Sequence, residues 1–197
     1  MQISQGAEAR IFLENNEITK NRFEKKYRHP LIDSELRKQR TRREAKILDK
    51  IQTINFPAPK ALFIDDKNGL LKMSFIEGSL VRNILNKNNS KKLSNEIGKK
   101  IALLHSKDII HGDLTTSNMI LKGNGIHFID FGLGFFSEKI EDKAVDLNLI
   151  RQALESKHHQ IWEQCFREVL EGYKNYNNHK EVFNRLKIVE SRGRNKH

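Results

Sequence analysis

Two short segments decide the fold: His111-Gly112-Asp113-Leu114-Thr115-Thr116-Ser117-Asn118 and, twelve residues after Asn118, Asp130-Phe131-Gly132. Between them, the apolar runs Met119–Leu121 and Ile126–Ile129 surround Gly123-Asn124-Gly125, a pattern that predicts a tight hairpin. Such a hairpin returns the chain to the place where it left the first segment. We therefore expect the oxygen-bearing side chains of Asp113, Asn118 and Asp130 to lie together, so that Asn118 and Asp130 can share one cation.

This order of loop, hairpin and Asp-Phe-Gly closely resembles the catalytic loop and metal-binding triplet of the kinase superfamily. Phosphoryl transfer needs a carboxylate aimed at the attacking oxygen and two oxygen ligands that hold magnesium against the phosphates of ATP. On this resemblance we assign Asp113 to catalysis, and Asn118 and Asp130 to the metal. Aspartates beside glycines are usually only turn formers, but turn chemistry does not explain the order of these elements.

Residues 1–76 are expected to form a small N-lobe. Five strands are predicted from their residue types and from the turns between them: Gln2–Gln5, Arg10–Glu14, Glu17–Arg22, Lys60–Ile64 and Leu70–Phe75. Asp33 can cap a long helix that runs to about Ile51, with apolar residues on one face and mainly arginine and lysine on the other. The pattern predicts a five-stranded antiparallel sheet with one long helix.

Residues 77–189 are expected to form a reduced, mainly helical C-lobe. A helix that leads up to the catalytic loop is predicted from an apolar stripe with helical spacing: Leu93, Ile97, Ile101 and Leu104. Residues 141–189 also have helical patterns, and residues 190–197 are expected to form a basic tail. The predicted fold class is α+β, a protein-kinase-like bilobal fold.

Lys20 and Glu44 occupy the positions at which a kinase fold places its phosphate-anchoring lysine and that lysine's acidic partner. Lys20 lies near the end of the third predicted strand, and Glu44 lies in the middle of the long helix. Lys25 and Lys26 are poorer candidates, because they fall in a polar turn beyond the strand. Two unrelated surface charges are the simpler alternative.

The remaining nucleotide contacts are assigned from their places in the kinase fold. The adenine base is expected to meet backbone groups of Ser74 and Ile76, between the two lobes. The phosphates are expected to meet the turn between the first two strands, although the usual Gly-x-Gly-x-x-Gly is missing there. That turn consists of Gly6, Ala7, Glu8 and Ala9.

The segment after Gly132 departs from an ordinary protein kinase. Only thirteen residues separate Gly132 from Asp146, too few for a conventional activation segment with a platform for peptide substrates. Gly112 stands where many kinases have an arginine that binds a phosphorylated activation loop, so we do not expect activation by loop phosphorylation. Asp146 is expected to cap or anchor the following helix beneath the catalytic loop, and an ordinary N-cap is an equally simple interpretation.

Two basic clusters account numerically for the formal net charge of +11. Residues 20–50 contain twelve Lys and Arg against five Asp and Glu, and residues 185–197 contain five against one. A localised basic surface favours a polyanionic partner, such as RNA. A solvated helix face with a frayed tail explains these charges equally well, because charge alone measures only non-specific attraction.

The composition also excludes several classes of protein. Cys165 is the only cysteine, so the chain has neither an internal disulfide framework nor a cysteine zinc site, and we expect Cys165 to pack in the core. No apolar run is long enough to span a bilayer, and the N-terminus lacks the pattern of a secretory signal. We expect a globular, cytoplasmic protein.

Several further motifs make the resemblance more specific: Gln5-Gly6-Ala7-Glu8-Ala9, Lys20-x-Arg22-Phe23-x-Lys25-x-Tyr27-Arg28-His29-Pro30, Arg42-x-Glu44-Ala45 and Arg192-Gly193-Arg194. Together with the catalytic loop they resemble, over essentially the whole chain, the small atypical kinase of the KEOPS complex, the PRPK family. The resemblance implies an ATP- and magnesium-dependent serine/threonine kinase and ATPase that supports threonylcarbamoyladenosine modification of tRNA. The chain begins at Met1, and we expect a free-standing kinase rather than one fused to a transferase.

The same resemblance implies partners. The KEOPS threonylcarbamoyltransferase subunit would bind the C-lobe, a small regulatory subunit would bind the N-lobe, and the basic helix and tail would face tRNA or a partner. Two alternatives remain open. A small-molecule kinase of the aminoglycoside or choline type also uses His-Gly-Asp, but generally needs a larger C-terminal region. A non-catalytic pseudo-kinase scaffold that binds tRNA would have no use for the set Lys20, Asp113, Asn118 and Asp130.

Overall fold

The computed structural model describes residues 1–6 and 8–194, and the chain divides into two compact units. The first unit comprises Met1–Glu77 together with Asp130–Leu133. The second comprises Gly78–Ile129 and the residues from Gly134 onward. The Asp-Phe-Gly segment therefore belongs to the first unit together with the N-terminal residues. The predicted domains, residues 1–76 and 77–189, are continuous ranges and place this segment in the C-lobe instead.

Within the described part of the first unit, five strands form one antiparallel sheet in the order β1-β2-β3-β5-β4. These strands are β1 (Gln2–Gln5), β2 (Arg10–Glu14), β3 (Glu17–Asn21), β4 (Ala61–Asp65) and β5 (Leu70–Ser74). The tight turn before β5 depends on Gly69, whose φ of +68° suits glycine. Lys20 lies opposite Leu71 in the central pairing of β3 with β5, so its backbone is held on both sides by sheet neighbours.

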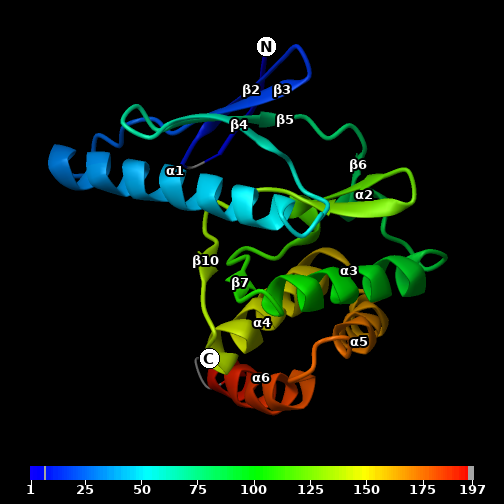
Figure 1. The fold of residues 1–197 in the computed structure, drawn as a ribbon. Coiled ribbons are helices and arrows are strands. Elements are labelled where there is room, and N and C mark those ends of the chain that lie inside the picture. Colours follow the sequence, from blue (N-terminus) through cyan, green and yellow to red (C-terminus); the bar gives the residue numbers. More distant parts are fainter. Residues whose placement is uncertain (7, 195–197) are drawn as a thin grey trace. The chain divides into compact units, whose positions relative to one another are not determined.

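The long helix α1 (Pro30–Gln52) lies along one face of this sheet (Figure 1). It buries Ile47, Leu48 and Ile51, as its apolar stripe predicts. The predicted cap is wrong: the N-cap is His29, and Asp33 lies one turn inside the helix. Proline at the first helical position explains the earlier start, because its fixed φ suits a helix and its missing N–H is not needed there.

The second unit is mainly helical. Its helices are α2 (Val81–Ile84), α3 (Ser90–His105), α4 (Ile140–Lys157), α5 (Trp162–Tyr173), α6 (His179–Arg194) and the 3₁₀ turn η1 (Thr116–Asn118). Its short strands are β6 (Ser79–Leu80), β7 (Ile109–Ile110), β8 (Met119–Lys122), β9 (Gly125–Phe128) and β10 (Phe135–Phe136). The predicted hairpin is confirmed as β8 and β9, which turn at Gly123 with a φ of +57°.

Helices α3 and α5 cross at glycines. A Cβ atom placed on Gly98 would overlap the carbonyl oxygen of Val169, and one placed on Gly172 would overlap that of Asn95. The apolar stripe of α3 is buried as predicted, with Ile97 and Ile101 fully inaccessible. The two helices can thus form a rigid support for the segment that leaves the C-terminal end of α3.

The residues predicted to form a basic tail begin within the last helix. Residues 190–194 continue α6, and Arg192 donates to the Glu141 carboxylate at 2.7 Å, while residues 195–197 lie outside the described part of the chain. Cys165 is buried in α5 as expected, and this burial raises the pKa of its thiol. Among the residues described, no helix has the length and apolar character required to cross a membrane.

Candidate active site

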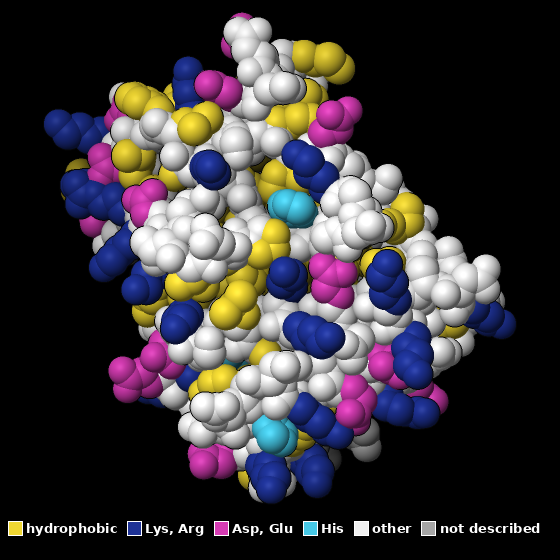
Figure 2. Space-filling model, turned by 45° about the vertical axis from the view of Figure 1, so that its right-hand side comes forward, with side chains coloured by type: hydrophobic (Ala, Val, Ile, Leu, Met, Phe, Trp, Pro, Cys, Tyr) yellow, Lys and Arg dark blue, Asp and Glu magenta, His cyan; other side chains and the backbone are white. Residues whose placement is uncertain are grey.

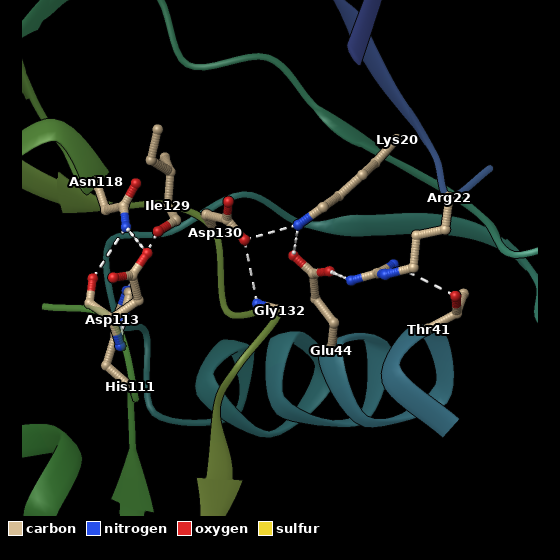
Figure 3. A network of polar contacts seen from close by, with 10 residues as sticks. All are labelled: Lys20, Arg22, Thr41, Glu44, His111, Asp113, Asn118, Ile129, Asp130 and Gly132. Atoms are coloured by element: carbon tan, nitrogen blue, oxygen red, sulfur yellow. Dashed lines mark hydrogen bonds and ion pairs between the residues drawn. The ribbon is translucent and has the colours of Figure 1, made fainter. Parts of the chain in front are cut away.

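The Lys20 ammonium lies between two carboxylates in the first unit (Figure 3). Its Nζ is 2.9 Å from Glu44 Oε1 and 2.7 Å from Asp130 Oδ1. The Lys20 and Glu44 side chains are almost inaccessible, whereas the Asp130 side chain is 49% exposed. Strand β3, helix α1 and the Asp-Phe-Gly segment therefore place the three predicted residues in one ion-paired cluster.

The backbone at Asp130 is bent so that its carboxylate meets Lys20. Asp130 has a φ of +62°, which is uncommon for a residue other than glycine, and its Oδ1 accepts from the Gly132 N–H at 3.2 Å. A Cβ atom on Gly132 would lie 3.0 Å from Asp130 Oδ1 and 3.2 Å from Lys20 Nζ. Glycine at this position leaves room for the charged groups to approach the backbone.

Arg22 also belongs to this cluster, although it was not predicted as a site residue. Its guanidinium donates through Nη2 to Glu44 Oε2 and through Nη1 to Thr41 Oγ1, the latter at 3.3 Å. The Arg22 side chain is 3% exposed. The available signal was its spacing, because side chains two residues apart on an extended segment point to the same face, and Lys20 is two residues before it.

In the second unit, Asp113 and Asn118 are hydrogen-bonded to each other. Asn118 Nδ2 donates to Asp113 Oδ2 at 2.8 Å and to the Asp113 carbonyl oxygen at 2.9 Å, which leaves the amide oxygen of Asn118 turned away from Asp113 (Figure 3). His111 stabilises the same loop from inside, since its ring nitrogens contact the Asp113 N–H and the Ile129 carbonyl oxygen. The predicted catalytic and metal residues thus fall into two groups, one in each unit.

Asp146 holds the catalytic loop through backbone hydrogen bonds. Its two carboxylate oxygens accept from the N–H groups of His111 and Gly112, each at 2.9 Å. Helix α4 begins at Ile140, so Asp146 is not an N-cap, and that interpretation is wrong. Gly112 has a φ of +77°, a backbone conformation that favours glycine at the position where many kinases have arginine.

A buried histidine fixes the Asp146 carboxylate in turn. His105 Nε2 lies 3.1 Å from Asp146 Oδ2, and His105 Nδ1 lies 2.7 Å from the Tyr173 hydroxyl. Burial raises the pKa of Tyr173, so this hydroxyl stays protonated and can donate to the ring. Helices α3, α4 and α5 are therefore joined by one polar network that ends on the catalytic loop.

A second histidine contacts the same loop. The Thr116 hydroxyl lies 3.1 Å from His158 Nε2, just after the last turn of α4. Burial lowers the pKa of His158, so the imidazole is neutral at physiological pH. Neither Thr116 nor His158 was assigned to the site from sequence, because the contact joins residues 42 positions apart.

The turn predicted to meet phosphates is held by ion pairs. Glu8 binds Arg28 at 3.1 Å and Arg40 at 2.7 Å. Partial burial alone would raise the pKa of Glu8, but these two guanidinium groups hold it below its usual value. The Gly6 N–H donates to the Ala9 carbonyl oxygen at 3.0 Å, and Ala7 lies outside the described residues.

The predicted adenine contacts lie at the end of β5. The Ser74 N–H donates to the Lys60 carbonyl oxygen, and the Ser74 hydroxyl accepts from the Lys60 N–H, each at 2.9 Å. The Ile76 side chain is buried. A ligand that met Ser74 through its backbone would have to use the carbonyl oxygen, because the N–H is already engaged.

Many cations of the two basic clusters are paired with acids. On α1, Arg37 binds the buried Asp33 carboxylate at 2.8 Å, and Arg42 binds Asp66. Figure 2 shows dark blue Lys and Arg side chains interspersed with magenta acidic ones over the face in view. The surface is therefore a mixed one on which an excess of positive charge remains.

The donor set suits a cation that is held jointly with phosphates. Within residues 1–6 and 8–194, no group of three or more His, Cys, Asp or Glu could hold a metal ion. Mg²⁺ is usually held by one or two carboxylates together with substrate phosphates and water, rather than by a cage made only of protein. A half-exposed Asp130 carboxylate next to a lysine fits that arrangement.

Comparison with known proteins identifies relatives over almost the whole chain. A family model described as "RIO domain" matches residues 8–134. The KEOPS complex subunit Bud32 of Pyrococcus abyssi (strain GE5 / Orsay) is 41% identical over 98% of this chain and 94% of that protein. A probable bifunctional tRNA threonylcarbamoyladenosine biosynthesis protein of Methanobrevibacter smithii is also 41% identical, over 99% of this chain, but this chain spans only 37% of that protein.

A solved structure shares the fold at low sequence identity. The Rio2 kinase from Chaetomium thermophilum, solved as an ADP/Mg²⁺-phosphoaspartate complex, matches 100% of this chain and 71% of its own with a TM-score of 0.67 and 13% identity. The predicted fold class is thereby confirmed: a protein-kinase-like fold with an antiparallel sheet in the N-lobe and a helical C-lobe.

Proposed function

The chain belongs to the RIO-domain family, and on that basis we propose that it is an ATP- and magnesium-dependent atypical serine/threonine kinase and ATPase of a KEOPS-type complex. In this role it supports threonylcarbamoyladenosine modification of tRNA, the process named in its bifunctional relatives. The observation that carries the proposal is the position of Lys20 Nζ, within 3 Å of both Glu44 and Asp130.

Phosphoryl transfer explains why these three charges are kept together. A kinase lysine binds nucleotide phosphates while its glutamate partner holds it in place, and the Asp-Phe-Gly aspartate binds the metal. Bound ATP with Mg²⁺ would supply the transferable phosphoryl group and a cation that neutralises its charge. Lys20 would then leave Asp130 for a phosphate oxygen, while Glu44 keeps its buried hydrogen bond to the ammonium.

The residues of the second unit have complementary roles in this proposal. We assign Asp113 to orienting the attacking hydroxyl or water and to accepting its proton. The Asn118 amide oxygen, turned away from Asp113, would be the second metal ligand besides Asp130. The Asp146 hydrogen bonds to the loop backbone would hold Asp113 ready before substrate arrives, which lowers the cost of reorganisation during transfer.

The nucleotide would be held at two further places. We assign the adenine base to backbone groups at Ser74 and Ile76, with the Ser74 carbonyl oxygen as acceptor. The phosphates would meet the turn of Gly6, Ala7, Glu8 and Ala9, whose position is stabilised by the ion pairs of Glu8. The turn contains one glycine, Gly6, in place of the three glycines that let the loop backbone of an ordinary kinase approach the phosphates closely.

Partner binding is supported by exposed apolar residues in both units. In the first unit, Tyr27, Leu31 and Ile32 are more than half exposed near the start of α1, and we assign this surface to the small regulatory subunit. In the second unit, Phe136 and Ile188 are exposed, and we assign this unit to the threonylcarbamoyltransferase subunit. The basic residues of α1 and α6 are assigned to tRNA.

Labelled ATP tests the proposal directly. The isolated chain is incubated with Mg²⁺ and ATP labelled on the γ-phosphate, alone and then with the transferase subunit and tRNA. We expect label on protein or as released phosphate, and loss of both when Mg²⁺ is chelated. Absence of nucleotide binding and of label release under every condition would support a non-catalytic tRNA-binding scaffold instead.

A second experiment separates protein or water from small molecules as the phosphate acceptor. Aminoglycosides and choline are added to the same reaction at millimolar concentration. We expect no increase in the rate of ATP consumption. A phosphorylated aminoglycoside or phosphocholine as product would assign the chain to the small-molecule kinases.

A further inference from the structure

Arg22 reaches the active-site cluster from the residue just after β3. Its backbone N–H donates to the Gly69 carbonyl oxygen at 3.0 Å, so the arginine is anchored against the turn before β5. From there the side chain extends toward α1, where it meets Thr41 and Glu44 (Figure 3). A guanidinium this deeply buried is costly to desolvate and needs a charged partner.

The Glu44 carboxylate binds two cations, one through each oxygen. Its Oε1 accepts from Lys20, and its Oε2 accepts from Arg22. Lys20 likewise binds two carboxylates, since its Nζ also lies 2.7 Å from Asp130 Oδ1. The cluster therefore contains two positive and two negative charges, arranged alternately from Arg22 through Glu44 and Lys20 to Asp130.

We propose that Arg22 is a positioning residue that satisfies half of the Glu44 carboxylate, so that Lys20 stays available to the phosphates of a nucleoside triphosphate. This inference rests on the proposed function, because it assumes that Lys20 exchanges Asp130 for a phosphate. With Arg22 present, Glu44 orients Lys20 through one oxygen only. The alternating order of charges lets the outermost partner of Lys20 be replaced without leaving a buried charge unpaired.

Removal of the Arg22 charge would make Lys20 less available to the phosphates. Two carboxylates would then compete for one ammonium, and the buried Glu44 would have Lys20 as its cation on both oxygens. Attraction between buried opposite charges is strong because water does not screen it, so Lys20 would be drawn toward Glu44 and away from a phosphate. Nucleotide affinity would fall even though every assigned contact residue is still present.

The surroundings of Arg22 limit its movement. The Thr41 hydroxyl, which donates to the Arg37 carbonyl oxygen at 2.8 Å, accepts from Arg22 Nη1 and orients the guanidinium. On the other side, a Cβ atom on Gly132 would come within 3.2 Å of Arg22 Nη2. The guanidinium is therefore enclosed between α1 and the Asp-Phe-Gly segment, both within the first unit.

Binding of Mg-ATP to three variants of the full chain tests the inference. Arg22→Met removes the charge, Arg22→Lys keeps it, and Lys67→Met removes an exposed cation from the turn before β5. We expect Arg22→Met to raise the Kd and the KM for Mg-ATP about tenfold or more, with a smaller effect on kcat. Arg22→Lys should recover most of the loss, and Lys67→Met should behave as the wild type.

A purely structural role for Arg22 predicts a different pattern. Loss of folded protein would lower the apparent kcat in proportion to the inactive fraction and leave the KM unchanged. If Arg22→Met shows no cooperative melting transition, Arg22→Lys carries the test, with an expected rise of about threefold in Kd because one ammonium cannot reproduce both guanidinium hydrogen bonds. A Kd within twofold of the wild-type value overturns the inference when it is measured for folded Arg22→Met, or for Arg22→Lys if that variant alone folds.

The two proposals can fail separately. If the wild type itself does not bind Mg-ATP, the proposed function fails, and the role of Arg22 fails with it. If the wild type binds Mg-ATP and Asp130→Ala does not, but Arg22→Met binds as tightly as the wild type, only the inference about Arg22 is wrong.

Discussion

The two groups of site residues are held in place by different kinds of interaction. In the first unit, Lys20, Arg22, Glu44 and Asp130 are positioned by ion pairs between side chains. In the second unit, the catalytic loop is positioned by one buried carboxylate, that of Asp146, which accepts from two backbone N–H groups. In the first arrangement, Lys20 can exchange Asp130 for a charged ligand. In the second, the Asp146 carboxylate and the two backbone N–H groups are already hydrogen-bonded to each other without a ligand.

The difference suits the chemistry proposed for each group. A lysine that must release a carboxylate and bind a phosphate needs a partner it can leave, and the half-exposed Asp130 is such a partner. A carboxylate that orients an attacking oxygen needs a fixed position, because small errors in geometry reduce the rate strongly. Substitutions in the first unit should therefore affect ligand binding, and those in the second should affect stability and the transfer step.

Asp130→Ala should have the largest effect. It removes both the proposed metal ligand and the outer partner of Lys20, so Mg-dependent ATP hydrolysis should fall by about 100-fold or more. The rate of phosphate release measures this, with the exposed Asp49→Ala on α1 as the matched control. Melting temperatures should stay close to that of the wild type, and equal turnover in mutant and wild type would reject the assigned mechanism.

Asp146→Asn tests whether the second group is indeed preorganised by the fold. The amide has one acceptor oxygen in place of two, so one of the His111 and Gly112 N–H groups loses its partner. We expect the free energy of unfolding to fall by about 2 kcal/mol, as measured by denaturant titration, and kcat to fall more than the affinity for Mg-ATP. A lower affinity with unchanged stability would contradict the distinction between the two groups.

The pH dependence of stability provides a finer test of the loop support. Burial lowers the pKa of His158, so the folded protein takes up a proton there less readily than the unfolded chain. Stability should therefore be unaffected by this group above pH ~6.5 and should decline as the pH falls below it, by up to about 1.4 kcal/mol per pH unit. His158→Gln should flatten this decline, while the exposed neighbour substitution His159→Gln should preserve it.

The smallest effect is expected for the exposed basic residues of α1, which belong to neither group of site residues. Arg37 and Arg40 bind Asp33 and Glu8, so reversing their charge would damage the first unit itself. Arg43→Glu is a cleaner test, because Arg43 is exposed on α1. The variant should bind tRNA more weakly, and the slope of log K against log salt concentration should become shallower by about one. Lys107→Glu in the second unit is the control. An unchanged slope would indicate that this face of α1 contacts water and not tRNA.

The local elements of the fold could largely be predicted from the sequence. The hairpins at Gly69 and Gly123 depend on residues that tolerate a positive φ, which is a property of the residue itself. The buried stripe of α3 follows from spacing alone. The start of α1 was misjudged because Pro30 outweighed Asp33, and Asp33 instead binds Arg37 from within the helix.

Partners of buried charges could not be predicted in the same way. Arg22 was visible in the motif around Lys20, but its carboxylate partner lies 22 residues further along the chain. Asp146 was placed beneath the loop, yet nothing in the local pattern indicated that His111 and Gly112 would donate to it, 34 to 35 residues away. Such contacts depend on how whole elements pack.

The sequence by itself determined the main helices and strands, the order of the catalytic motifs and the family, because turn residues, apolar spacing and motif spacing are local properties of the chain. Only the tertiary structure decided which buried charges meet, namely Arg22 with Glu44, and Asp146 with the loop backbone. A buried charge must find a partner wherever packing brings one, and packing is set by contacts between residues far apart in sequence.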